Sequence, residues 1–147
     1  MTRIYKDKKM KESWKELIVL MCSICDTAED GHLNSYGESF FAGHKMFEDV
    51  QDAVHDFPDA IQEIYFGARE LPFVSSKDIR EAEVAQLKSV KNGKDAARHL
   101  KDLIVVALDK AKELDADEDT TLGEKDLLSK IAGTLQQKLY FIQNYLK

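Results

Sequence analysis

Histidines and acids recur at helical spacings between His32 and Glu63. Glu48 lies four residues after His44, and Glu63 lies four residues after Asp59. On a helix, residues four apart share one face, so each pair presents its two side chains together. Imidazole and carboxylate groups together suit iron, zinc or manganese, and mixed sites with open positions are usual for redox-active iron. On spacing alone, a solvated helix face is the commoner explanation, because the chain is 33% charged.

The segments that must position these residues are patterned as helices. Apolar residues recur every three or four positions in long stretches, which is the signature of amphipathic helices. Gly31 is placed to end the first helix, and Pro58 predicts either a kink or a stop and restart with Asp56 as the cap. The stretches run over Trp14–Ala28, Phe40–Val54, Ala60–Ala68, Ala97–Leu114 and Leu127–Leu146, and a short helix is expected over Ile79–Leu87.

This pattern predicts an all-α fold. Four long helices with a short one in the middle connection favour a four-helix bundle, and no stretch alternates as a β-strand would. The length of 147 residues, with 7 Gly and 2 Pro, suits one domain with a full hydrophobic core. We expect the bundle domain to occupy residues 12–147.

Composition also bounds the location of the protein. No apolar run approaches the roughly 20 residues that span a bilayer, and no signal-peptide stretch follows the charged start of the chain. The two cysteines, Cys22 and Cys25, cannot build a disulfide framework, which fits a reducing compartment. We therefore expect a cytoplasmic protein that makes no membrane contact.

Charge is unevenly distributed along the chain. The formal net charge is −6, yet residues 1–11 carry five basic residues against the single acid Asp7. We expect this segment to be a flexible basic arm on an acidic body. The arm is either a solubilising tail or, repeated on many subunits, a contact for DNA phosphates. Its basic residues are Arg3, Lys6, Lys8, Lys9 and Lys11.

The whole string from His32 to Glu63 resembles the Dps family of small ferritin-like proteins. Eleven residues separate His32 from His44, an acid follows four later, and Asp59 and Glu63 stand four apart. In that family this series forms the ferroxidase site, with two aromatics before the second histidine, as in Phe40–Phe41 here. The last helix, from Asp126 on, is also similar, so the resemblance covers roughly residues 12–147.

The resemblance implies a ferritin-like subunit assembled into a hollow shell of twelve. His32 and His44 would come from one subunit, Asp59 and Glu63 from its two-fold partner, and Glu48 would be shared or supporting. Iron is the implied metal. Fe(II) would be oxidised by hydrogen peroxide or oxygen and stored as Fe(III), which protects against oxidative damage. Members that coat DNA use lysine-rich N-terminal tails, which would make the protein nucleoid-associated.

The chain also departs from the family pattern. Leu33 stands where the family commonly has a Trp, which removes a residue that could quench radicals. The polar segment Glu29–Gly31 predicts a loosened His32, and Pro58 predicts a kink in a helix that is normally continuous. Acids near the start of the last helix line iron-attracting pores in related shells, and the matching acids here are Asp119, Glu124 and Asp126.

Several alternatives remain open from the sequence. One is a metal site within a single bundle, built on Glu29 and His32 with a weaker Asp52–His55 pair. A zinc or redox site at Cys22 and Cys25 is another, although an apolar helix stripe favours buried thiols there. His55 and His99 are expected to be surface or satisfied interface residues. The protein could also be a non-catalytic DNA-compacting or partner-binding shell, or a small bundle whose metal pattern is accidental.

Overall fold

A computed structural model of the chain describes residues 2–147. Within that range the chain is helical and contains no strand, which confirms the all-α prediction. Two short segments of other helix types, η1 and η2, interrupt the α-helices. The elements are α1 (Arg3–Leu33), η1 (Gly37–Ser39), α2 (Phe40–Val54), α3 (Phe57–Ile61), η2 (Gln62–Gly67), α4 (Ser76–Val84), α5 (Gly93–Asp115) and α6 (Leu122–Tyr145).

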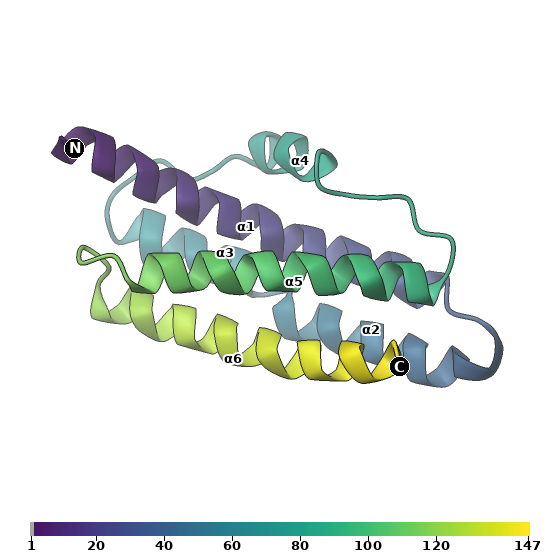
Figure 1. Ribbon diagram of the computed structural model, residues 1–147. Coiled ribbons are helices and arrows are strands. Elements are labelled where there is room, and N and C mark those ends of the chain that lie inside the picture. Colours follow the sequence, from purple (N-terminus) through teal and green to yellow (C-terminus); the bar gives the residue numbers. More distant parts are fainter. Residues whose placement is uncertain (1) are drawn as a thin grey trace.

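The long helices form the expected four-helix bundle (Figure 1). Helix α1 packs against α2 and α5, and α6 packs against the same two helices, so α1 and α6 lie on a diagonal. The α2 position of the bundle is continued by α3 and η2. The short helix α4 stands outside this square on the flank of α1, between two extended connections (Figure 1).

One continuous core fills the space between the helices. The apolar stripe expected on the first helix is buried, with Trp14, Leu17 and Ile24 fully inaccessible to solvent. No helix within residues 2–147 combines the length and apolarity that crossing a bilayer requires.

Side-chain caps fix where several helices begin. The hydroxyl of Thr121 accepts from the backbone N–H of Glu124, whose carboxylate accepts from the N–H of Thr121 in return, which is a capping box. Ser75 caps α4 and Asn92 caps α5 in the same way. Ser and Asn suit these positions, because their side chains satisfy the free amides of a first turn.

The N-terminal segment differs from the expected flexible arm. From Arg3 on, it forms the first turns of α1, which Thr2 caps by accepting from the backbone N–H of Tyr5. Lys6 then reaches the α5–α6 connection, where its ammonium lies 2.8 Å from Glu118 and 3.0 Å from Asp119. Within residues 2–147, the acids of the connection thus compensate Lys6 alone among the basic residues of this segment, a contact between distant parts of the sequence.

Gly31 does not end α1 as expected. The helix continues through Leu33, and Gly31 is buried where α1 crosses α2. A Cβ at this position would lie 2.6 Å from ring carbons of Phe47. The glycine therefore allows α1 and α2 to pack closely. From the sequence alone it looks like a helix end, because glycine also favours the backbone conformation found there.

The predicted disturbance at Pro58 is confirmed. Helix α2 ends at Val54 and α3 restarts at Phe57 after a tight turn, with Pro58 in the first turn, where its missing N–H costs nothing. Asp56 is the N-cap residue, but its side chain makes no capping bond. The backbone at Asp56 stays near helical values, φ −85° and ψ −10°, so the restart is a kink rather than a redirection of the chain.

Candidate metal centre

His32 and His44 are brought together at one corner of the bundle. His32 lies on the last turn of α1 and His44 on the second turn of α2, and the close approach at Gly31 sets the gap between these helices. The two imidazole rings stack with centroids 3.7 Å apart. Because α1 remains helical through Leu33, His32 is held in place and is not loosened by the polar residues before it.

The backbone fixes the protonation pattern of both rings. His32 Nδ1 lies 3.2 Å from the carbonyl oxygen of His44, and His44 Nδ1 lies 3.3 Å from the carbonyl oxygen of His32. A carbonyl only accepts, so each Nδ1 carries the proton and donates it. In the neutral imidazole the lone pair then sits on Nε2, which is the state that binds a metal ion. The reciprocal bonds therefore prepare two Nε2 donors side by side.

Exposed apolar side chains surround this histidine pair. Phe40 stacks on His44 with ring centroids 5.1 Å apart, and Phe41 beside it is 83% exposed. Leu33 and Tyr36 are also exposed at this corner. Exposed apolar side chains gathered near polar groups are typical of a surface that another protein covers.

Glu48 lies one turn beyond His44 on α2. Its carboxylate accepts a hydrogen bond from the ammonium of Lys45 at 3.0 Å, and its side chain is 45% exposed. Lys45 also lies 3.3 Å from Asp49. The Glu48 charge is thus shared with a surface lysine, which leaves the carboxylate close to the histidines but not committed to them.

Asp59 and Glu63 are distant from the histidine corner. Fifteen residues of nearly continuous helix separate His44 from Asp59, which corresponds to roughly 22 Å. Both carboxylates are exposed, and within residues 2–147 neither has a hydrogen-bond or ion-pair partner. The subunit therefore carries a pair of nitrogen donors at one place and a pair of free carboxylates at another.

A complete metal site within one subunit is not formed. Nowhere in the described part of the chain do three His, Cys, Asp or Glu side chains gather closely enough to hold an ion. The intrasubunit alternatives on Glu29 with His32, and on Asp52 with His55, therefore lack an assembled ligand set. Among residues 2–147, the side chain of the exposed His55 has one polar partner, its neighbour Asp56.

The cysteines are half-buried free thiols on α1. Burial, with smaller contributions from nearby acids, raises the pKa of Cys22 to about 11 and that of Cys25 to about 12. Both are therefore protonated near neutral pH, whereas the metal-binding form is the thiolate. This environment favours the apolar role expected from the helix stripe.

The chain is similar to known proteins in its structure but not in its sequence. No family profile and no curated protein matches the chain in sequence. Among solved structures, Dps from Thermosynechococcus elongatus superposes with a TM-score of 0.84 at 17% identity, covering 96% of this chain and 92% of that one. The chain has the fold of a Dps protein.

Two further solved structures support that assignment of the fold. A Dps protein from Vibrio cholerae O1, described as a member of a broad superfamily of ferritin-like diiron-carboxylate proteins, gives a TM-score of 0.81 at 18% identity and covers 100% of this chain and 97% of that one. A mutant of Dps1 from Mycobacterium smegmatis gives 0.77 at 17% identity, with both chains covered completely. The resemblance to Dps drawn from the histidine and acid spacing is thus confirmed for the fold.

The expected pore acids have different environments in this Dps-like fold. Glu124 is 1% exposed and forms a two-pronged ion pair with Arg69, at 2.7 Å from Nε and 3.0 Å from Nη2. Its charge is thereby compensated inside the subunit, which gives Glu124 a structural partner, and a pore role for it stays untested. Asp119 pairs with Lys6, whereas Asp126 is exposed and pairs only with Lys130 on its own helix. A pore role stays a prediction for Asp119 and Asp126.

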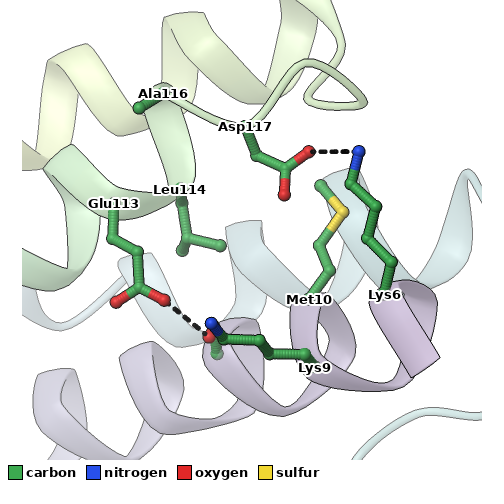
Figure 2. Close-up of a pocket in the computed structure, with 8 residues that line it drawn as sticks. Lys6, Lys9, Met10, Glu113, Leu114, Ala116 and Asp117 are labelled. Carbon is green, nitrogen blue, oxygen red and sulfur yellow. Dashed lines mark hydrogen bonds and ion pairs between the residues drawn. The ribbon is translucent and has the colours of Figure 1, made fainter. Parts of the chain in front are cut away.

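The basic residues of α1 divide into paired and unpaired groups. Lys6, Lys9 and Asp117 line a pocket of about 270 Å³ (Figure 2). Across it, the ammonium of Lys6 lies 4.0 Å from a carboxylate oxygen of Asp117. Within the described residues, Lys9 has no ion-pair partner. The same holds for Arg3, Lys8 and Lys11, which are exposed.

Other polar side chains were missed or misjudged in the sequence. His99 is 7% exposed, so it is not a surface residue, and neither ring nitrogen meets the criteria for a hydrogen bond within the described chain. Burial and the nearby Lys88 lower the pKa of His99. Glu83 on α4 is 2% exposed beside Asp26, and Gln62 binds the backbone of Val74. No local pattern marks these residues, because their partners come from other elements.

Proposed function

We propose that the chain is a ferroxidase and iron-storage protein of the Dps type. In this proposal Fe(II) is the substrate, hydrogen peroxide or oxygen is the oxidant, and Fe(III) is retained inside a hollow shell of identical subunits. The observation that carries the proposal is the reciprocal bonding of His32 and His44, because it directs two neutral Nε2 donors to one place. A structural histidine pair would have no need to leave both metal-binding nitrogens free.

The complete site would lie between two subunits. His32 and His44 would come from one copy, and Asp59 and Glu63 from a second copy related by a two-fold axis. Three observations support this division: each half is incomplete, the carboxylates are unpartnered, and the histidine corner carries an exposed apolar rim. A two-fold contact is self-complementary, so each interface would complete two equivalent sites.

The residues of such a site fit the chemistry of iron oxidation. Imidazole nitrogens and carboxylate oxygens together bind Fe(II), and the carboxylates stabilise the ferric product, which carries the higher charge. Few ligands leave a position open for the oxidant. Glu48, one turn from His44, would supply a further carboxylate once Lys45 releases it.

The assembly and location follow from the same proposal. A closed shell, a dodecamer as in the family, would keep ferric mineral away from the rest of the cell and so limit oxidative damage. The place of action would be the cytoplasm. Asp126 and Asp119 would help to draw Fe(II) towards the entry pores by focusing negative potential.

The experiment that tests the proposal loads the protein with Fe(II) without air and then adds a pulse of hydrogen peroxide. Ferric absorbance should rise faster than in buffer, and iron should elute with a large assembly on a sizing column. The double variant His32→Ala/His44→Ala should lose the acceleration and keep the assembly. His55→Ala is the matched control for loss of a histidine, since His55 is exposed, lies against Asp56 and is not a proposed ligand, although it stands one turn before Asp59. Equal rates with and without protein would refute the proposal.

A second candidate function is DNA binding by α1. The unpaired cations Lys8, Lys9 and Lys11 favour it, because ammonium groups without acids beside them remain available to phosphates. Replacing these three with Gln should weaken DNA binding and flatten its dependence on salt, whereas Lys6→Gln should change little because Lys6 already pairs with Glu118. A gel-shift titration at several salt concentrations would measure both effects. Undiminished binding by the triple variant would contradict it.

A further inference from the structure

The helix that carries Asp59 and Glu63 changes type between these two residues. Asp59 lies in α3, whereas Glu63 lies in η2, a π-helical segment that begins at Gln62. There the backbone bonds span five residues, as shown by the N–H of Ala68 donating to the carbonyl of Glu63 at 3.1 Å. A turn of this kind is rare in proteins and frequently occurs at functional sites.

Burial of two consecutive aromatics accounts for the wide turn. Ile61, Tyr65 and Phe66 are 0%, 2% and 0% exposed, so residues four and five positions apart both face the core. Tyr65 stacks on Trp14 with centroids 4.9 Å apart, which anchors that side of the segment. An ordinary α-turn would rotate Phe66 away from Ile61, and the five-residue turn keeps both inside.

Gln62 fixes the start of the wide turn. Its Nε2–H donates to the carbonyl of Val74 at 2.9 Å, and its Oε1 accepts from the N–H of Val74 at 3.1 Å. The two bonds tie the first residue of η2 to the connection that follows it, after the chain has reversed near Glu70, where φ is 54°. A side-chain amide held at both ends cannot rotate, so the backbone beside it is also restrained.

We propose that Gln62 is a positioning residue for the metal centre. Its two hydrogen bonds to the backbone of Val74 would set the direction in which the side chain of Glu63 points relative to that of Asp59. This inference rests on the proposed function, since it gives Glu63 a metal ion to bind. Gln62 itself would touch no substrate. Outer residues of this kind typically change metal affinity by about 10–100-fold when they are replaced.

The test uses the assembled protein and Co²⁺, a redox-inert probe whose visible spectrum reports ligand geometry. Gln62→Leu removes both bonds to Val74, and Gln62→Glu keeps the length while losing the N–H donor. Each should weaken Co²⁺ binding about tenfold or more and shift the Co²⁺ absorption bands, while the elution volume of the assembly stays unchanged. Amide exchange at Val74 should quicken in Gln62→Leu, which confirms that the tie is broken. Gln136→Glu, at an exposed position on α6, is the control.

The outcomes separate this inference from the proposed function. If the unaltered protein neither binds Co²⁺ nor oxidises Fe(II), both fall. If it does both and the Gln62 variants bind Co²⁺ with unchanged affinity and spectrum, only the positioning role is overturned. A purely structural role would also be revealed, because it would lower stability without moving the absorption bands.

Discussion

Two groups of acids in this molecule look alike in sequence and differ in their surroundings. Those near the start of α6 are compensated within the subunit, as Glu124 by Arg69 and Asp119 by Lys6. Asp59 and Glu63 stand exposed and unpartnered within the described chain. The comparison shows that the number of acidic residues in a segment does not indicate how many of their carboxylates lack an ion-pair partner. The run with more carboxylates stabilises the fold, and the sparser pair keeps its ligand capacity.

The largest expected effect comes from removing the free pair. Asp59→Asn with Glu63→Gln should reduce the rate of Fe(II) oxidation by about a hundredfold or more, because the amides bind ferric iron poorly. Thermal unfolding should be unchanged, since no partner is lost. The matched control, Asp119→Asn with Asp126→Asn, removes the same charge and should slow oxidation only a few fold. Stopped-flow absorbance measures both, and equal losses would erase the distinction between the two groups.

A mixing experiment sharpens the claim that the free pair acts across an interface. Subunits carrying His32→Ala/His44→Ala are dissociated together with subunits carrying Asp59→Asn/Glu63→Gln and then reassembled. Random pairing at two-fold contacts should restore about a quarter of the original sites. Activity that stays at the level of the separate variants would place both halves of the site in one subunit, against the division proposed here.

The compensated group predicts a loss of stability instead. Glu124→Gln should lower the free energy of unfolding by about 3 kcal/mol, because it leaves Arg69 without its buried partner. The capping box at Thr121 can persist, because a Gln side-chain oxygen still accepts from the N–H of Thr121. Denaturant unfolding monitored by circular dichroism measures the change. Oxidation by the folded fraction should match that of the unaltered protein, and a selective loss of oxidation would return Glu124 to the iron pathway.

Glu83 is intermediate between the unpartnered acids and the fully paired ones, and we expect its replacement to have the smallest effect on the protein. It is buried beside Asp26 and only partly compensated by Arg80, at 3.4 Å, and burial raises its pKa to about 7. The folded state thus binds a proton more tightly than the unfolded state does, so stability falls as pH rises from about 4.5 to 7. Glu83→Gln should remove this slope and stabilise the protein above pH 7 by about 1 kcal/mol. Melting temperatures across pH would show it, and an unchanged slope would contradict it.

The sequence predicted what depends on local periodicity and capping. The buried stripe around Trp14, the start of α5 at Asn92 and the kink at Pro58 all follow from rules that act within a few residues. Helical periodicity predicted the bundle, and the whole series from His32 to Glu63 carried the resemblance to Dps, which solved structures confirm for the fold although no relative matches in sequence. The stacking of the His32 and His44 rings, by contrast, is visible only in the structure, and their role as ligands stays a prediction.

The remainder depends on contacts between distant segments. Lys6 joins the first helix to the α5–α6 connection, and the expected arm forms the first turns of that helix. Arg69 reaches Glu124 across 55 residues, which no spacing rule detects. The wide turn at Gln62 arises from burial on two sides of η2. Each of these requires knowledge of which surfaces meet before the role of a single residue can be assigned.

Gly31 has a consequence for how this chain can change by mutation. A methyl group there would overlap the ring of Phe47, and overpacking of this kind costs about 1–3 kcal/mol. Substitution of the glycine is therefore blocked until Phe47 becomes smaller, and a smaller residue at Phe47 first opens a cavity in the core. Few mutational paths therefore lead away from glycine at position 31. The close approach of α1 to α2, on which the position of the histidine pair depends, is preserved as a result.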